Sequence, residues 1–169
     1  MTTKINSFTG EYYFLSNFYE TPVTYNGITF LNNEAAFQAQ KCKSRAAEEP
    51  TVSLSTKREM FADLNASEAK KLGRKVSLRE DWEDVKIGIM KEIVQAKFEQ
   101  HPELAEKLLQ TDTAYLEEGN TWGDRVWGTV DGKGANNLGR ILMQVREILR
   151  ERQISMETVS YTHLTLPTN

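Results

Sequence analysis

The residues best suited to chemistry come early in the chain, where Glu34, Gln38 and Lys41 follow one another at helical spacing. At about 100° per residue, offsets of four and seven place their side chains within about 60° of one another on a helix. A carboxylate, an amide and an amine on one stripe suit the binding and cleavage of a polar ligand. The same stripe also suits a solvent-exposed helix face on which Glu34 complements the helix dipole, and the pattern alone favours this plainer interpretation.

A second cluster lies in residues 117–128, whose composition is unusual for a loop: three acids, three glycines and two tryptophans. Glycine permits turns that other residues resist, and the flat face of Trp122 or Trp127 offers a surface on which a base can stack. A carboxyl group beside such rings has a raised pKa and suits general acid catalysis. The alternative is a structural loop whose tryptophans fill the core, and composition alone leaves both interpretations open.

A third candidate, residues 132–140, is a glycine-rich turn that leads into a helix. It lacks the spacing of a Walker loop and of a dinucleotide-binding fingerprint. The free N–H groups of a helix N-terminus favour an anion such as a phosphate, although a plain asparagine cap explains the spacing better. Arg74 and Arg79 are further phosphate-binding candidates, with solvent exposure as the simpler interpretation for at least one of them.

The elements that must position these residues are mainly helices. Residues 23–30 place Asn26-Gly27 between two β-rich triplets, which predicts a hairpin with a type I′ turn. The aromatic residues 12–18 predict a strand that runs into a loop. Caps and apolar periodicity predict helices at residues 34–43, 55–64, 67–72, 81–100, 102–110 and 137–152, and a short strand at 114–116. The fold class is therefore α+β, mainly α: a single helical domain with a small N-terminal antiparallel hairpin or sheet.

Composition narrows the class of protein. The 169 residues fit one domain, here residues 1–153, and the net charge of −3 argues against a generally basic nucleic-acid-binding surface. Cys42 is the only cysteine, which excludes an internal disulfide, suits a reducing cytoplasm and, with only two histidines, predicts no metal site. Without an apolar stretch of about 18 residues or an export signal, we expect a cytoplasmic protein. Residues 157–169, poor in charge and rich in threonine, look like a non-native cloning scar outside the fold.

Taken in order, these clusters resemble the NADAR (YbiA-like) family. The motifs that carry the resemblance are residues 14–19, 33–41, 73–74, 81–83, 90, 97–98, 118–128 and 134–143. Each motif is weak alone, the ordered set is specific, and the resemblance extends over about residues 8–149. It implies a mostly helical domain with a small sheet, and an enzyme that hydrolyses N-glycosidic bonds of ribosides without a cofactor.

The same resemblance implies residue roles. Glu34, Trp82 and Asp124 match residues implicated in cleavage, and Lys41 matches a lysine proposed to attack the ribose anomeric carbon in members that remove ADP-ribose. Our hypothesis is that Glu34 faces the anomeric carbon, where it stabilises the cation or activates water, while Asp124 protonates or orients the leaving group. Lys41 either binds the anionic end of the substrate or acts as the nucleophile. The candidates for substrate binding are Asn17, Gln38, Arg74, Trp82, Glu118, Asn120, Trp127 and Asn136.

Three functions fit these residues. The favoured one is hydrolysis of a small phosphoribosylated or ADP-ribosylated nucleobase compound, such as an early phosphoribosylamino-pyrimidine intermediate of riboflavin synthesis. The first alternative is removal of ADP-ribose from guanine in modified DNA, which would make the protein a toxin antagonist. The second is a non-catalytic module that binds NAD or ADP-ribose, although pure binding does not require both Glu34 and Asp124. No membrane partner is expected.

Overall fold

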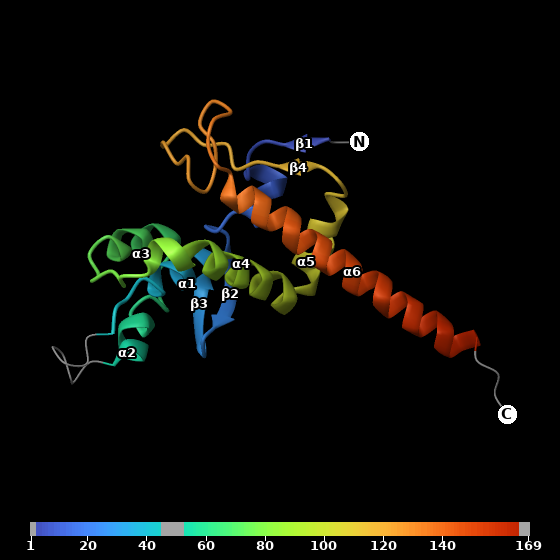
Figure 1. The fold of residues 1–169 in the computed structure, drawn as a ribbon, viewed down its shortest axis with the longest axis horizontal. Helices are drawn as coiled ribbons and strands as arrows, with labels where there is room; N and C mark the ends of the chain where they lie inside the picture. The colour runs from blue at the N-terminus through green and yellow to red at the C-terminus, as the bar shows by residue number, and fades with distance from the viewer. Residues whose placement is uncertain (1–2, 45–52, 166–169) are drawn as a thin grey trace.

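A strand hairpin and the helices packed against it support the first helix of the chain. In this computed structural model the described residues are 3–44 and 53–165, with side chains described as far as residue 158. Figure 1 shows α1, α3 and α4 grouped around the hairpin, α6 running obliquely past α4 and α5, and a long loop that precedes α6.

The hairpin pairs β2 (Glu20–Tyr25) with β3 (Ile28–Asn32) in antiparallel register. Asn26 and Gly27 have positive φ values of 51° and 79°, as a type I′ turn requires, so the predicted hairpin is confirmed. Buried and exposed residues alternate along both strands, and α1 and α4 pack against the hairpin. The buried face of the hairpin is therefore part of the same core as these two helices.

The short helix α1 (Asn33–Ala39) follows β3 directly and is buried along its whole length. Asn32 caps the helix, because its Oδ1 accepts the Ala35 N–H at 2.7 Å. The prediction that this helix continues for another turn is wrong. The chain instead leaves the helix and forms a β-bridge between Cys42 and Leu78.

Four further helices follow in the order expected. Their bounds are α2 (Leu54–Glu59), α3 (Ala66–Gly73), α4 (Trp82–Gln100) and α5 (Pro102–Gln110). A capping box formed by Asn65 and Glu68 begins α3, and Pro102 begins α5. The last three helices agree with the prediction to within one residue at each end, whereas α2 ends five residues earlier than predicted, at residue 59 rather than 64.

The N-terminal segment differs most from the prediction. Residues 12–18 do not form a strand, because a 3-10 helix, η1 (Gly10–Leu15), occupies much of the segment. A second sheet pairs β1 (Lys4–Ile5) in parallel with β4 (Tyr115–Leu116). Strand β4 was predicted and its partner was not, since a strand of two residues carries no alternation of polar and apolar side chains.

Helix α6 (Asn137–Thr165) continues well past residue 152, where it was predicted to end. Its first part packs against α4 and α5, whereas residues 151–158 are all exposed, and Figure 1 shows this end projecting beyond the other helices. The exposed part contains no glycine or proline that would end a helix. The separate expectation that residues 157–169 are non-native stays a prediction, and residues 166–169 lie outside the described part of the chain.

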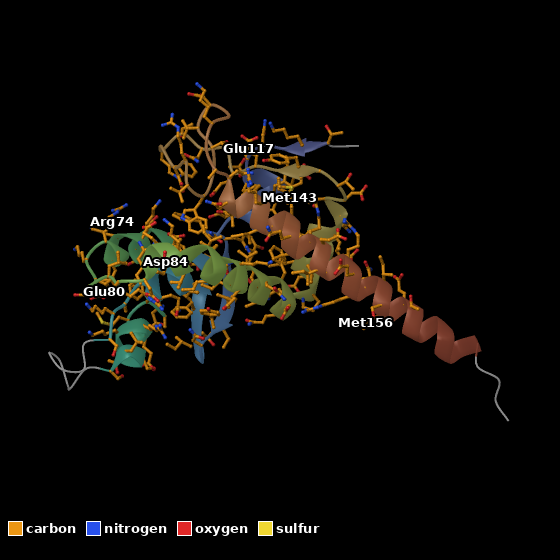
Figure 2. The ribbon with its side chains drawn as sticks, in the orientation of Figure 1. Arg74, Glu80, Asp84, Glu117, Met143 and Met156 are labelled. Carbon is orange, nitrogen blue, oxygen red and sulfur yellow. The ribbon has the colours of Figure 1, made fainter. Side chains whose placement is uncertain are left out.

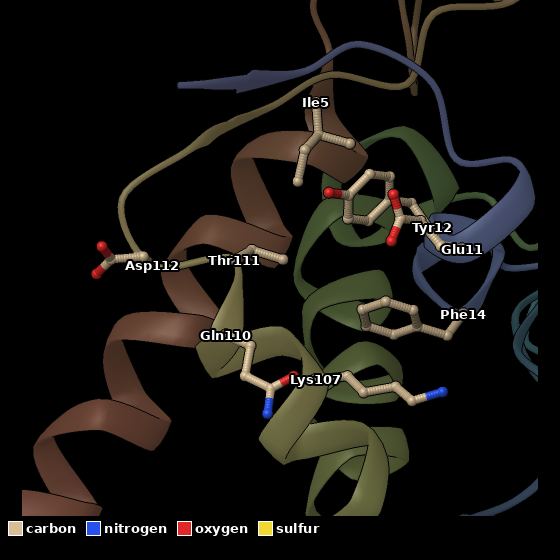
Figure 3. A pocket seen from close by; sticks show the side chains of 8 residues that line it. All are labelled: Ile5, Glu11, Tyr12, Phe14, Lys107, Gln110, Thr111 and Asp112. Atoms are coloured by element: carbon tan, nitrogen blue, oxygen red, sulfur yellow. The ribbon is translucent and has the colours of Figure 1, made fainter. Parts of the chain in front are cut away.

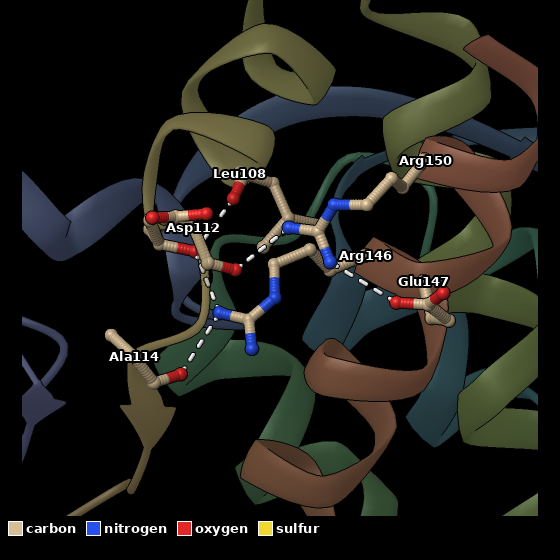
Figure 4. Close-up of polar contacts among 7 residues, drawn as sticks. Leu108, Asp112, Ala114, Arg146, Glu147 and Arg150 are labelled. Carbon is tan, nitrogen blue, oxygen red and sulfur yellow. Dashed lines mark hydrogen bonds and ion pairs between the residues drawn. The ribbon is translucent and has the colours of Figure 1, made fainter. Parts of the chain in front are cut away.

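A buried arginine ties α6 to the turn that follows α5. Arg146 Nη1 donates to the Thr111 hydroxyl and to the Ala114 carbonyl, both at 2.9 Å. One turn later, Arg150 donates to the Asp112 carbonyl at 2.7 Å (Figure 4). These bonds fix the segment between α5 and β4, and with it the start of the loop that precedes α6.

A buried lysine fixes the segment after η1. Lys97 of α4 is 1% exposed, and its Nζ donates to the Phe14 carbonyl at 2.6 Å and to the Ser16 carbonyl at 3.1 Å. The next residue, Asn17, accepts the Glu34 N–H through its own carbonyl at 3.0 Å. Lys97 therefore positions the backbone that supports the start of α1. Burial lowers the pKa of Lys97 to about 7.

Replacing Lys97 with methionine should remove a pH-dependent part of the free energy of unfolding. Between a folded-state pKa of about 7 and the ordinary value of 10.5, the unfolded chain holds a proton that the folded chain has released. The lysine's contribution therefore becomes more favourable as pH rises, by up to about 1.4 kcal/mol per pH unit. We expect the difference in unfolding free energy, wild type minus Lys97→Met, to increase from pH 7 to pH 9 in urea titrations. Lys91→Met on the same helix is the matched control, and a difference that stays constant over this range would contradict the prediction.

Candidate active site

The helix stripe that carries Glu34 and Gln38 faces the interior, so its interpretation as a solvent-exposed face is wrong. Glu34 is 8% exposed and Gln38 is 4% exposed, and Gln38 Nε2 donates to Glu34 Oε1 at 2.9 Å. Gly73 of α3 comes so close that a Cβ there would lie 1.9 Å from Gln38 Oε1. A side chain at this position would therefore collide with the Gln38 amide.

The pKa of Glu34 is shifted by groups from α1 and the residues just after it, from α3 and from the loop before α6. Burial raises the pKa of its carboxyl group, and the negative charge of Asp124 raises it further. The hydrogen bond from Gln38 and the positive charges of Lys70 and Lys41 act in the opposite direction. Side chains that are remote in sequence therefore lie close enough to act on one carboxyl group.

Lys41 lies just beyond the end of α1 and is partly buried. Burial lowers the pKa of its amine, while the charge of Glu34 raises it. The positive charges of Arg74, Lys70 and Lys86 lower the pKa of Lys41 further. These four basic residues form a group, here called the cation group, beside a buried carboxylate.

Aromatic rings form one wall of the site. Trp82, the first residue of α4, packs against Phe37 of α1 with ring centroids 4.9 Å apart, and Trp127 meets the same Phe37 edge-on at 5.2 Å. Lys41 Nζ lies 5.9 Å from the centroid of the Trp82 ring. Trp122 is 64% exposed, so only one of the two tryptophans of residues 117–128 joins this wall.

Asp124 is held in place by the loop that carries it. Its Oδ1 accepts the N–H groups of Val126 and Trp127 at 3.0 and 2.9 Å. Asn120 holds the same turn, because its Nδ2 donates to the carbonyls of Asp124 and Thr129 and its Oδ1 accepts the Asp124 N–H at 3.0 Å. The amide of Asn120 is thus engaged by the loop backbone.

Glu118 stands at the start of the same loop. Its N–H donates to Asn136 Oδ1 at 3.0 Å, and Asn136 Nδ2 donates in turn to a carbonyl of β4 at 2.9 Å. Glu118 Oε2 is buried and meets no hydrogen-bond partner among the described residues. Burial raises the pKa of Glu118 to about 8, with Asp124 and Glu34 raising it and Lys70 lowering it.

The remaining predicted residues lie at the back and at the edge of the site. Asn17 is buried behind Glu34, and its side-chain Oδ1 accepts a long hydrogen bond of 3.4 Å from Asn33 Nδ2. Arg74 follows α3 and is exposed (Figure 2). It joins the site only through its charge, which acts on Lys41.

Sequence reasoning missed Lys70. Its charge acts on Glu34, Lys41 and Glu118, so the same basic residue lowers the pKa of Glu34 and of Glu118. The signal was present, because Lys70 precedes Arg74 by four residues and therefore shares its helix face.

Other features of the structure lie apart from this cluster. A cavity of about 490 Å³ lies between η1 and the end of α5 (Figure 3), and none of the residues lining it belongs to the predicted site. Within residues 3–44 and 53–165, no group of three or more His, Cys, Asp or Glu side chains is arranged to hold a metal ion. In the same described ranges, no helix combines the length and the apolar character that crossing a membrane requires.

Known proteins are similar to this chain along nearly its whole length. The NADAR domain matches residues 6–150. The N-glycosidase YbiA of Shigella flexneri is 39% identical over 142 residues, which cover 82% of this chain and 82% of that protein. A riboflavin biosynthesis protein of Vibrio vulnificus is 37% identical over 141 residues, and this match spans only 36% of that protein.

A solved structure agrees with the fold. The NMR structure of YbiA from E. coli superposes with a TM-score of 0.75 at 36% identity, covering 91% of this chain and 89% of that one. The α+β, mainly α architecture with a small antiparallel hairpin is therefore confirmed. The domain match, the sequence identity and the shared fold together show that the chain belongs to the NADAR domain family.

Proposed function

We propose that the protein hydrolyses the N-glycosidic bond of a phosphorylated riboside. The observation that carries this proposal is the meeting of three carboxyl groups, those of Glu34, Glu118 and Asp124, with the amine of Lys41 beside the Trp82 ring. Buried titratable groups that shift one another's pKa are typical of active sites, because separate acid and base roles need separate pKa values.

Cleavage of an N-glycosidic bond requires both an ionised carboxylate and a proton donor. Breaking the C1′–N bond builds positive charge on the ribose ring and negative charge on the leaving base. An ionised carboxylate stabilises the first and a proton donor neutralises the second. In the proposed site Glu34 faces the anomeric carbon and takes a proton from the attacking water. Asp124 orients the leaving base, and Trp82 and Trp127 stack on it.

The cation group supports a phosphorylated substrate. Arg74, Lys70 and Lys86 each lower the pKa of Lys41, so each of these charges repels a protonated Lys41. Lys86 is in addition paired with Glu83 at 2.5 Å. A bound phosphate would relieve this repulsion and accept charge-assisted hydrogen bonds. This arrangement favours a phosphoribosyl compound over an unphosphorylated nucleoside.

The relatives support the reaction class. Proteins of Shigella flexneri and Nostoc punctiforme that share 39% and 43% identity with the matched segments are named N-glycosidases. The Vibrio vulnificus relative is named a riboflavin biosynthesis protein. We therefore propose a phosphoribosylamino-pyrimidine intermediate of riboflavin synthesis as the substrate.

Incubation of the purified protein with three compounds tests this function. They are the phosphoribosylamino-pyrimidine, its dephosphorylated counterpart and free ADP-ribose, with released base and sugar measured by mass spectrometry. We expect base release from the phosphorylated pyrimidine to exceed that from its counterpart by at least about tenfold, the ratio that one charged hydrogen bond of about 1.4 kcal/mol provides. Binding of any of these compounds without release of a base would point to a non-catalytic module.

Replacing Glu34 with glutamine should abolish most of the activity. The substitution keeps the size of the side chain but removes the negative charge that stabilises the ribose cation and the base that accepts a proton from water. We expect kcat to fall by roughly 10²–10⁴. Glu106→Gln, on the exposed face of α5, is the matched control. A Glu34→Gln variant with the wild-type kcat would rule out this role for Glu34.

A second candidate function rests on the lowered pKa of Lys41. An amine whose pKa is lowered by burial and by neighbouring cations is better suited to nucleophilic attack than an ordinary lysine. This chemistry corresponds to removal of ADP-ribose from a modified guanine in DNA, through a Schiff base between Lys41 and the opened ribose.

Chemical trapping tests this second function. If Lys41 is the nucleophile, sodium cyanoborohydride added during incubation with an ADP-ribosylated guanine oligonucleotide should leave ADP-ribose covalently attached at Lys41. Peptide mass spectrometry locates the adduct, and Lys41→Arg, which keeps the charge, should carry none. An unmodified Lys41 with no release of ADP-ribose would reject this function.

A further inference from the structure

The backbone of Glu118 is held by hydrogen bonds on both sides, whereas one oxygen of its carboxyl group is buried without a partner among the described residues. Its N–H donates to Asn136 at 3.0 Å, and its carbonyl accepts the Thr129 N–H at 2.9 Å. A Cβ on Gly128 would lie 2.0 Å from the same carbonyl, so the loop closes tightly over this backbone. By contrast, Glu118 Oε2 is buried and unpaired among the described residues. A buried polar atom without a partner is costly, and it suggests a role that the resting structure does not display.

The surroundings of Glu118 and Glu34 differ, although burial raises the pKa of both carboxyl groups. The hydrogen bond from Gln38 and the charges of Lys70 and Lys41 lower the pKa of Glu34, whereas the charge of Asp124 raises it. Glu118 faces the negative charges of Asp124 and Glu34, with Lys70 as the opposing cation. Burial and these anions raise the pKa of Glu118 to about 8, so it holds its proton at neutral pH.

Asp124, the earlier candidate for proton donation, differs from Glu118 because its carboxylate accepts hydrogen bonds from the backbone. Its Oδ1 accepts two backbone N–H groups, those of Val126 and Trp127. These bonds orient the side chain as a hydrogen-bond acceptor within its own turn. The buried Oε2 of Glu118 has no such bonds among the described residues, although the residue as a whole is partly exposed.

On the basis of the proposed N-glycosidase activity, we infer that Glu118 donates the proton to the leaving base. As the C1′–N bond breaks, its electron pair passes to the base nitrogen, which takes the proton from the Glu118 carboxyl group. Water adds to C1′ and gives a proton to Glu34. That proton returns to Glu118 through solvent, so the cycle consumes one water and releases the free base and the sugar.

The pH dependence of catalysis tests this assignment. In the wild-type protein, kcat/KM should fall as pH rises through about 8, where Glu118 loses its proton. Glu118→Gln keeps the shape of the side chain and cannot donate a proton in this way, so kcat/KM should fall by roughly 10²–10⁴ and the alkaline decline should disappear. The neighbouring Glu117→Gln, which instead changes a residue bound to Thr129 and Lys4, is the matched control and should keep both the rate and the decline.

A second variant tests the inference should Glu118→Gln fail to fold. The charge of Asp124 raises the pKa of Glu118, so Asp124→Asn should move the alkaline decline to lower pH even though the variant is slower. A decline that stays in place in Asp124→Asn would overturn the assignment, as would a Glu118→Gln variant with wild-type kcat/KM and an unchanged profile.

These outcomes separate the inference from the function on which it rests. If the wild-type protein releases no base from any substrate tested, the proposed N-glycosidase activity fails and Glu118 has no leaving group to protonate. Suppose instead that the wild-type protein releases base, that Glu118→Gln keeps the wild-type kcat/KM and pH profile, and that the decline stays in place in Asp124→Asn. The N-glycosidase activity then stands, and a group other than Glu118 is the acid.

Discussion

The burial of α1 is the constraint on which the rest of the site depends. A helix of seven residues has all of them buried, although it carries Glu34 and Gln38. Placing a carboxyl group in the interior costs free energy unless it is hydrogen-bonded or its charge is balanced. Here Gln38 supplies the hydrogen bond and two lysines supply the charge. The hairpin, α3 and α4 pack around α1, and each of the two helices contributes groups to the site.

In the loop before α6, two asparagine side chains hold the backbone that carries the acidic residues. The amides of Asn120 and Asn136 bind the backbone around Asp124 and Glu118, and their contact with a ligand stays a prediction. Asn136 also adopts a positive φ of 52°, a conformation that asparagine tolerates better than most residues. These side chains hold two acids at fixed positions in a loop that has almost no regular secondary structure. Rigidity of this kind suits groups whose pKa values depend on their mutual distances.

Much of this arrangement could be predicted from the sequence, and the failures have identifiable causes. The turn at Asn26-Gly27, the helices that begin at Asn65 and Pro102, and the candidate set around Glu34 follow from local chemistry and from family motifs. Burial of the α1 stripe did not, because helical periodicity shows which residues share a face and not what covers that face. The pairing of β1 with β4 joins segments more than a hundred residues apart through two residues each, and no local pattern encodes such a contact.

Gly73 has a consequence that extends beyond helix packing. A Cβ at this position would meet the side chain of Gln38, and Gln38 is the residue that donates a hydrogen bond to Glu34. A larger residue would therefore displace the Gln38 amide and weaken the hydrogen bond that lowers the pKa of Glu34. The acidity of one carboxyl group is in this way linked to a residue on another helix that never touches it.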